Sequence, residues 1–424
     1  MKKRFFSIIA IVILSISYVY SQTYVQLTLD QYLEKVRSGN LEYAAQRLNM
    51  EIADAKIISA SVFNNPSIGF AYYNNELNNM QMGQGVSGEI SQTISPGRRR
   101  ASINLANSEK EVSQALLVDY FRLLREQATV TWLEAVKRRQ LYQIMKESYL
   151  AQIQLLASDS LSRGSEFLRD LDILQNKVET GILCAHLFEM ENELNEIHLV
   201  ITNFCGVSAT DTVFIPEKKN IWNDKSFIIS EIIEEALNNR ADILALKKEI
   251  DVSNYAINVA KAGRIPEFDL SFGYGLNAQV HNELAPSPKF IGIEMGLSFP
   301  IPLFDRNKGE ILSAEMEKKQ AEYRYIQSEI QLKSEVIGAY NYFVITDKKM
   351  NLFRCGLVKS AKDALDQKRS EYHKGNIHLI EVLDAQRSYD QVLLSFYSAI
   401  FDKSKALVKL ESAIGIWNIQ VGII

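Results

Sequence analysis

Four short segments of the chain alternate apolar residues with small or polar ones. Residues 67–72 read Ser-Ile-Gly-Phe-Ala-Tyr and residues 270–276 read Leu-Ser-Phe-Gly-Tyr-Gly-Leu, while residues 290–299 repeat the pattern and residues 86–94 follow it more weakly. A period of two predicts β-strands with one apolar face. Lipid on one side and water on the other would require this pattern, and so would an antiparallel sheet of a soluble protein. The predicted strands are about 66–74, 86–94, 267–277 and 290–299.

Proline and helix-forming residues divide the rest of the chain. None of the eight prolines lies in residues 97–215 or after residue 302. Because proline breaks helix interiors, these spans can hold very long helices, and both are rich in Ala, Leu, Glu, Lys, Gln and Arg. Apolar positions between residues 392 and 410 follow steps of three and four, which fits either a heptad seam or an ordinary amphipathic helix.

The chain contains two similar halves. Pro66 and Pro266 each lie between a predicted helix and a predicted strand, and the spacing from Gly164 to Gln175 recurs from Gly375 to Gln386. Each half is predicted as helix, β-hairpin, long helix, turn and helix, so the fold is expected to be mainly α with a small β part. The predicted parts are a first repeat at 22–205 with a turn at about 161–166, a linker at 206–226, a second repeat at 227–415 with a turn at about 372–377, and a tail at 416–424.

The first residues resemble a secretory signal. Three basic residues at 2–4 precede an apolar run at 8–16, and a plausible cleavage point follows Ser21. Residues 1–21 are therefore predicted to be a signal peptide, with an uncleaved anchor helix as the alternative. No later stretch of about 18 apolar residues is present, so the mature chain is expected to be either soluble outside the cytoplasm or a membrane β-barrel.

One copy of the chain cannot form a closed barrel by itself. Four strands cannot close a barrel, which needs at least about eight, whereas three copies would supply twelve. A helix of about 60 residues would reach about 90 Å and needs neighbours along its length. Both arguments predict an assembly of several copies.

Residues 375–386, Gly-Asn-Ile-His-Leu-Ile-Glu-Val-Leu-Asp-Ala-Gln, together with the two halves and the strand pairs, resemble the TolC-like outer-membrane efflux protein family. The resemblance implies a homotrimer with a 12-stranded β-barrel in the outer membrane, continued by an α-helical barrel in the periplasm. It further implies a periplasmic adaptor protein and an inner-membrane pump, of the proton-driven RND type, that supplies the energy.

The resemblance also assigns roles to residues near the two turns. Glu381 and Asp384 match an acidic ring in the pore entrance, and Asp170 and Tyr372 match a network that holds the tip closed. Ile377 stands where the family prototype carries a gating arginine, so that bond is not expected here. The turns expected to dock the adaptor contain Arg163, Gly164, Ser165, Lys374, Gly375 and Asn376. Glycine in each turn is expected to adopt a left-handed backbone.

Composition and motifs narrow the function. The net charge of −4 gives no basic field for nucleic acid. The chain has no nucleophile elbow, phosphate loop or paired metal-ligand motif, so no enzyme activity, catalytic residue, cofactor or metal is predicted. His373 and His378 do not have a diagnostic ligand spacing. The three cysteines are expected to be small buried hydrophobes, with one disulfide as the alternative.

The main functional hypothesis is a passive exit duct for drugs, metals or other small molecules. The alternative is the outer-membrane component of a type I protein secretion system, which would use the same architecture. A third possibility is a periplasmic coiled-coil protein without a pore. The sequence does not name the substrate.

Overall fold

The computed structural model describes residues 23–76, 82–159, 166–210, 212–217, 220–221, 226–418 and 421–422. The predicted signal peptide and the turn residues Arg163, Gly164 and Ser165 lie outside these ranges. The fold is mainly helical, with one larger sheet. The chain forms two compact units, one made of residues 1–46, 118–240 and 330–424 and the other of residues 47–117 and 241–329.

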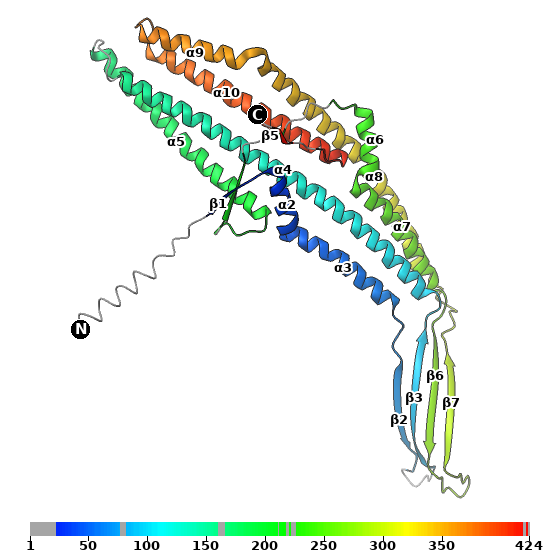
Figure 1. Cartoon of the computed structure of the whole chain (residues 1–424). Coiled ribbons are helices and arrows are strands. Elements are labelled where there is room, and N and C mark those ends of the chain that lie inside the picture. Colours follow the sequence, from blue (N-terminus) through cyan, green and yellow to red (C-terminus); the bar gives the residue numbers. More distant parts are fainter. Residues whose placement is uncertain are drawn as a thin grey trace, which may run out of the picture. The chain divides into compact units, whose positions relative to one another are not determined.

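The second unit contains a four-stranded antiparallel sheet of order β2-β3-β6-β7. Figure 1 shows the four strands side by side. Its strands are β2 (Ser67–Asn74), β3 (Gln84–Ile94), β6 (Phe268–Asn277) and β7 (Phe290–Ser298). The unit also contains α7 (Ala241–Ala262) and parts of α3 (Leu41–Ser61), α4 (Arg98–Asp159) and α8 (Lys308–Leu352).

The strand register aligns most apolar residues of the four strands on one face of this sheet. Ile68, Ile90, Phe272 and Met295 form one cross-strand row. The adjacent row on the opposite face is small or acidic, and contains Gly69, Glu89, Gly273 and Glu294. Because side chains alternate between faces, most rows on one side are apolar and most rows on the other are small or polar. The row of Tyr73, Gly85, Asn277 and Phe290 is an exception, because it carries two aromatic side chains on the second face. The apolar residues remain exposed, as Met295 shows with 83 % of its surface accessible.

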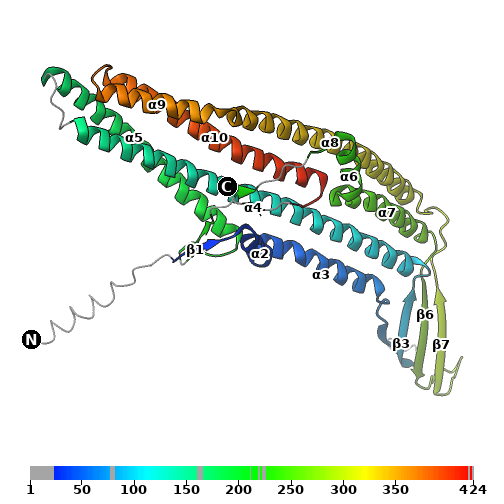
Figure 2. The same ribbon diagram turned by 45° about the horizontal axis from the view of Figure 1, so that its top comes forward.

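The first unit is a helical bundle with two small sheets. Its helices include α2 (Leu29–Gly39), α5 (Glu166–Phe204), α6 (Ile229–Asn239), α9 (Val358–His373) and α10 (Leu379–Ile414). Helices α9 and α10 run side by side in both views (Figure 1, Figure 2). Strand β1 (Thr23–Leu27) pairs in parallel with β4 (Thr212–Pro216), and β5 (Asn220–Ile221) pairs with β8 (Val421–Gly422). The second half of α10 is buried almost continuously and forms much of the core.

Two helices that the sequence pattern predicts as continuous are broken. The span at about 29–60 is divided into α2 and α3 at Asn40, whose backbone is extended. Asn40 Oδ1 accepts a hydrogen bond from the backbone N–H of Tyr43 at 2.8 Å, so its side chain starts a new helix. The corresponding span of the second half is divided into α6 and α7 at Arg240, which is likewise extended.

The long helix after β7 is interrupted as well. Residues 353–357 form a single π-helical turn in which Gly356 has φ +94°, between α8 and α9. Glycine permits this conformation because it lacks a Cβ atom. The segment predicted as a linker contains β4 and β5, and the burial of Val213 and Phe214 explains why it is ordered there. Within the described ranges, every helix is too short or too polar to cross a membrane.

Candidate functional site

The turn between α9 and α10 is closed by backbone hydrogen bonds around a left-handed glycine. Gly375 has φ +77°. Its N–H donates to the carbonyl of Tyr372 at 2.8 Å, and the N–H of Asn376 donates to the carbonyl of Glu371 at 3.0 Å. This pair of bonds is the Schellman motif, which satisfies carbonyls at a helix end. The second predicted tip is therefore a tight helical hairpin.

Side chains reinforce the same turn. The carboxylate of Glu371 accepts hydrogen bonds from the amide of Asn376 at 2.7 Å and from the ammonium of Lys374 at 2.8 Å. These two bonds, first that of Asn376 and then that of Lys374, hold the pKa of Glu371 below its usual range. Lys374 and Asn376, two of the predicted docking residues, are therefore held against the turn.

The two predicted ring carboxylates are both paired with cations. The ammonium of Lys368 lies 2.5 Å from Glu381, and the guanidinium of Arg387 lies 3.0 Å from Asp384. The hydrogen bond from Lys368 lowers the pKa of Glu381. Sequence reasoning missed both cations. Lys368 and Glu381 lie at nearly equal distances from Gly375 along a helical hairpin, and this spacing could have indicated their contact.

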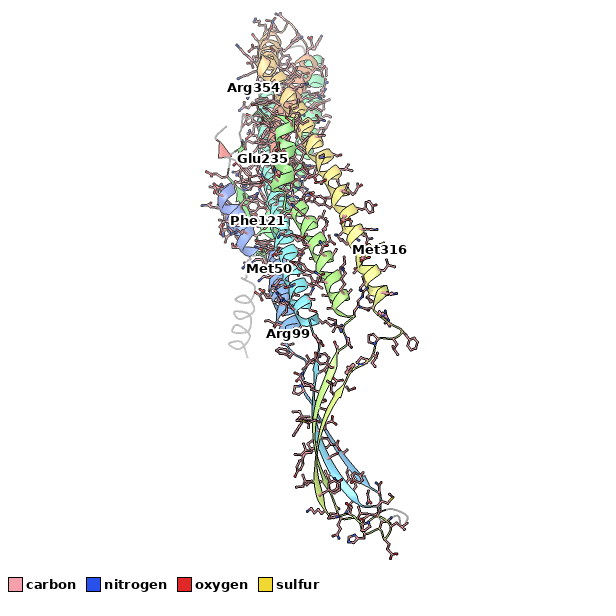
Figure 3. The ribbon with its side chains drawn as sticks, turned by 90° about the vertical axis from the view of Figure 1, so that its right-hand side faces the viewer. Met50, Arg99, Phe121, Glu235, Met316 and Arg354 are labelled. Atoms are coloured by element: carbon pink, nitrogen blue, oxygen red, sulfur yellow. The ribbon has the colours of Figure 1, made fainter. Side chains whose placement is uncertain are left out.

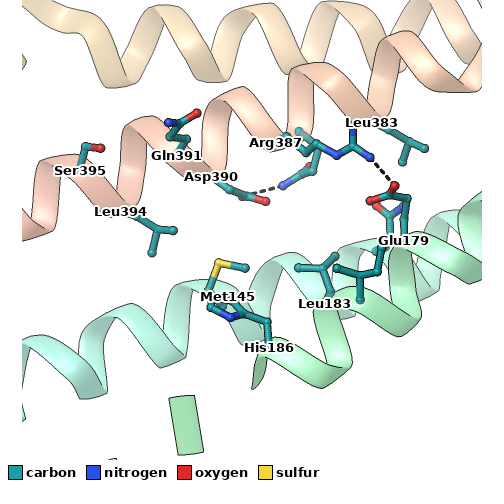
Figure 4. Close-up of a pocket in the computed structure, with 13 residues that line it drawn as sticks. Met145, Glu179, Leu183, His186, Leu383, Arg387, Asp390, Gln391, Leu394 and Ser395 are labelled. Atoms are coloured by element: carbon teal, nitrogen blue, oxygen red, sulfur yellow. Dashed lines mark hydrogen bonds and ion pairs between the residues drawn. The ribbon is translucent and has the colours of Figure 1, made fainter. Parts of the chain in front are cut away.

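Arg387 also connects α10 with the helix of the first half. Its guanidinium forms an ion pair with Glu179 of α5, drawn as a dashed line in Figure 4. Glu179 is the more buried partner, because its side chain is 19 % exposed and that of Arg387 is 52 % exposed. One arginine therefore neutralises a carboxylate on its own helix and another on α5.

A buried polar network lies behind these ion pairs. The hydroxyl of Ser148 donates to Asp390 at 2.5 Å, and the amide of Gln386 donates to the other oxygen of Asp390 at 2.8 Å. The guanidinium of Arg369 donates to the amide oxygen of Gln386 at 2.6 Å. Burial raises the pKa of Asp390, while its hydrogen-bond donors and Arg369 oppose that shift. The network joins α4, α9 and α10 through the glutamine that ends the repeated Gly-to-Gln spacing.

An adjoining cavity of about 350 Å³ lies between α4, α5 and α10. Figure 4 shows apolar side chains of all three helices around it, with Asp390 and the Arg387–Glu179 pair. Its apolar lining includes Met145, Ile182, Leu183, Leu383 and Leu394. The apolar side chains pack α4, α5 and α10 together, and Arg387 balances the charge of Glu179.

Comparison with known proteins finds sequence matches over much of the chain. The family described as "Outer membrane efflux protein" matches residues 232–416. A cobalt-zinc-cadmium resistance protein, CzcC of Cupriavidus metallidurans, is 20 % identical over 92 % of this chain and 90 % of its own length. Outer membrane protein TolC of Vibrio cholerae is 21 % identical over 75 % of this chain and 70 % of its own length.

Solved structures extend the match to nearly the whole fold. A crystal structure of CusC superposes with a TM-score of 0.76 at 15 % identity, covering 94 % of each chain. The outer membrane channel CmeC of Campylobacter jejuni gives a TM-score of 0.72 at 15 % identity, covering 91 % of this chain and 85 % of its own. Residues 232–416 match the outer membrane efflux protein family, and the fold of nearly the whole chain is similar to that of the solved outer membrane channels. The matched structures are of membrane channels.

The gate residues that the family resemblance implies are only partly described. Tyr372 lies in the last turn of α9, with its ring centroid 6.1 Å from that of His373. Asp170 belongs to α5, but its side chain lies outside the described part of the structure. The pairing expected between them is therefore still a prediction. No cluster of three or more metal-ligating side chains occurs in the described part of the chain.

Proposed function

We propose that the chain is the outer-membrane exit duct of a tripartite efflux system. The observation that carries this proposal is the four-stranded sheet, which exposes one apolar face across all its strands. Such a surface is unfavourable in water, because each large apolar side chain left exposed lacks about 1.5–3 kcal/mol of stabilising burial free energy. Lipid removes that cost, while the small and acidic rows of the other face suit a water-filled lumen.

The sheet requires partner strands. In the described residues, β2 and β7 form its outer edges and each has a neighbour on one side alone. Unpaired edge groups cannot be exposed to lipid, so β2 of one copy pairs with β7 of the next. Three copies give a 12-stranded barrel and a homotrimer, in which the two repeats of each copy contribute two strands each.

The helices extend the duct through the periplasm. Helix α4 has 62 residues and is about 90 Å long at about 1.5 Å per residue. The hairpin at Gly375, together with the turn that the sequence predicts at about 161–166, meets a periplasmic adaptor protein. A proton-driven inner-membrane pump of the RND type supplies the energy, and the duct conducts drugs, metals or other small molecules passively. The resistance protein CzcC supports a small toxic substrate.

Ion selectivity follows from the charges near the hairpin. Three copies of Glu381 and Asp384 place six carboxylates around the periplasmic entrance, which favours cations. Lys368 and Arg387 offset much of that charge within each copy. The preference for cations is therefore weak in this protein.

A second function is favoured by one comparison. The proteases secretion protein PrtF of Dickeya chrysanthemi is 23 % identical over 59 % of this chain and 57 % of its own length. In that case the duct is the outer component of a type I secretion system, and its cargo is a polypeptide.

The test begins with the purified full-length protein. We expect three-copy cross-links between cysteines placed along β2 and β7, and single-channel conductance in a planar bilayer. A water-soluble monomer that shows neither would contradict the proposal. Deleting the gene and exposing the cells to a panel of toxic compounds and metals then separates the functions, since efflux predicts sensitivity and secretion predicts loss of an exported protein.

A further inference from the structure

The four segments that join strands to helices in the second unit come together. We call residues 61–66, 95–100, 263–267 and 299–310 the collar. The Arg99 guanidinium donates to the carbonyl of Ser61 at 2.6 Å, and Arg98 pairs with Glu267 at 3.0 Å. Figure 3 places Arg99 where the helices give way to the strands. The collar therefore lies at one end of the sheet, directly beyond its apolar face.

The collar exposes large apolar side chains. Phe63 is 74 % exposed and Phe304 is fully exposed, and the intervening segments add several aliphatic residues. The exposed apolar residues of the collar are Val62, Phe63, Ile265, Phe299, Ile301, Leu303 and Phe304. They lie in the segments that directly precede or follow the strands of the sheet.

Cations are interleaved with these apolar residues. The collar contains six basic side chains and three carboxylates. One carboxylate, Glu267, is already paired with Arg98, and another, Asp305, accepts a hydrogen bond from the backbone N–H of Asn307 at 2.8 Å. The basic residues are Arg98, Arg99, Arg100, Arg264, Arg306 and Lys308. The surface is therefore both apolar and positively charged.

Three of the arginines occupy a position that is unfavourable for the helix itself. Arg98, Arg99 and Arg100 form the first turn of α4, which contains no acidic residue. The partial charge at a helix N-terminus is positive, so cations there are destabilising. Arg98 is complemented by Glu267 and Arg99 by the carbonyl of Ser61. Arg100 and Arg306 are both exposed, so their charge is accessible to a group outside the protein.

We propose that the collar binds the phosphate headgroups of anionic phospholipids at one leaflet surface, with its apolar side chains inserted beside the acyl chains. This inference rests on the proposed membrane insertion of the sheet. Aromatic and aliphatic groups beside cations fit a lipid interface, where headgroup phosphates lie next to hydrocarbon. The collar thereby fixes the depth of the sheet in the bilayer and selects anionic lipid.

The test measures lipid preference in the reconstituted full-length protein. The protein is reconstituted in phosphatidylcholine vesicles that contain a trace of spin-labelled phosphatidylglycerol or spin-labelled phosphatidylcholine. The spectrum of each label reports the fraction of that lipid held at the protein surface. One cation near an anionic membrane surface is worth roughly fivefold in affinity. We expect the wild type to prefer phosphatidylglycerol by about fivefold or more. The variant R100Q/R306Q/K308Q should lose most of that preference.

A matched variant controls for net charge. R47Q/K247Q/K319Q removes three exposed cations of the same unit outside the collar and should keep the preference. Equal loss in both variants, or no preference in the wild type, overturns the inference. Conductance is recorded from each sample. A protein that conducts in pure phosphatidylcholine but binds both lipids equally overturns the collar proposal alone, whereas failure to insert into any vesicle overturns the proposed function.

Discussion

The guanidinium of Arg240 donates a hydrogen bond to the carbonyl oxygen of Ala413 at 3.1 Å. The first half of the chain has an equivalent contact, because the amide of Asn40 donates to the carbonyl of Phe204 at 3.1 Å. In each half, the residue that breaks a pair of helices also satisfies a carbonyl near the end of the last helix. These carbonyls have no partner within their own helix, so the break and the helix end stabilise each other.

Replacing Arg240 should destabilise the first unit. Arg240 is 5 % exposed and also pairs with Glu335 at 3.0 Å. Because hydrogen bonds to charged groups contribute about 1.5–3 kcal/mol, Arg240→Met should lower the free energy of unfolding by about that amount. Arg324→Met is the control, since Arg324 forms an exposed pair with Glu249 and should cost at most about 1 kcal/mol. Urea unfolding followed by circular dichroism measures both, and equal costs would contradict the prediction.

A side chain at Gly375 should loosen the hairpin. The left-handed backbone there costs about 1–2 kcal/mol for an ordinary L-residue. Gly375→Ala should therefore speed hydrogen exchange at the N–H of Asn376 by about tenfold, as measured by mass spectrometry. Gly375→Asn should have a smaller effect because asparagine tolerates this conformation. Unchanged exchange in the alanine variant would show that the turn relaxes at little cost.

Removing the ammonium of Lys368 should increase cation selectivity. Lys368→Gln leaves Glu381 without its paired cation, so the proposed trimer gains three uncompensated negative charges at the proposed entrance. The reversal potential under a potassium chloride gradient should shift toward greater cation permeability, most strongly at low ionic strength. Lys359→Gln removes an equal charge from an exposed position of α9 and should leave the potential nearly unchanged. Identical shifts would show that Glu381 does not line the entrance.

Acid should destabilise the first unit through His198. Burial, aided by Arg139, lowers the pKa of His198 from 6.5 to about 4. Between these values the unfolded chain binds a proton that the folded chain does not, so stability falls as the pH drops from 6.5 to about 4. His198→Gln should flatten that part of the wild-type profile of urea midpoints. His186→Gln, at an exposed position, should preserve the wild-type profile. A profile that His198→Gln leaves unchanged would rule out His198 as the cause of the acid destabilisation.

Charge on the apolar face of the sheet should block insertion. Lysine in place of Ile293 would face lipid and cost about 2–4 kcal/mol near the bilayer centre. Ile293→Lys should therefore reduce the folded fraction recovered in vesicles, as measured by heat-modifiable gel mobility. Ser271→Lys places the same charge on the opposite face and should insert much better. Equal recovery of the two variants would mean that the sheet does not separate lipid from water.

The strands could be predicted because their environment imposes a period of two. Each strand has one apolar face, and the alternation around Ile68 and Ile293 follows directly from that requirement. Strand β3 begins at Gln84, earlier than its weak alternation indicates, because Gly85 and Gly88 contribute no apolar side chain. The helix break at Asn40 had a local signal, since asparagine after glycine is typical of a helix boundary.

The buried network could not be predicted from sequence. Ser148 and Asp390 are ordinary helical residues when considered separately, and only the packing of α4 on α10 brings them to 2.5 Å. The same holds for Arg387 and Glu179, which contribute from different halves. Family resemblance indicated the acidic residues but not the cations beside them, because pairing depends on side-chain direction across a hairpin.

The parallel pairing of β1 with β4 sets an order for maturation. Thr23–Leu27 is made early, yet its partner Thr212–Pro216 follows only after the first hairpin and the two helices behind it. Because synthesis proceeds from the N-terminus, β1 has no β4 partner until the intervening hairpin and helices have been made. Any factor that slows production of the first half therefore lengthens the time for which this five-residue strand lacks its β4 partner.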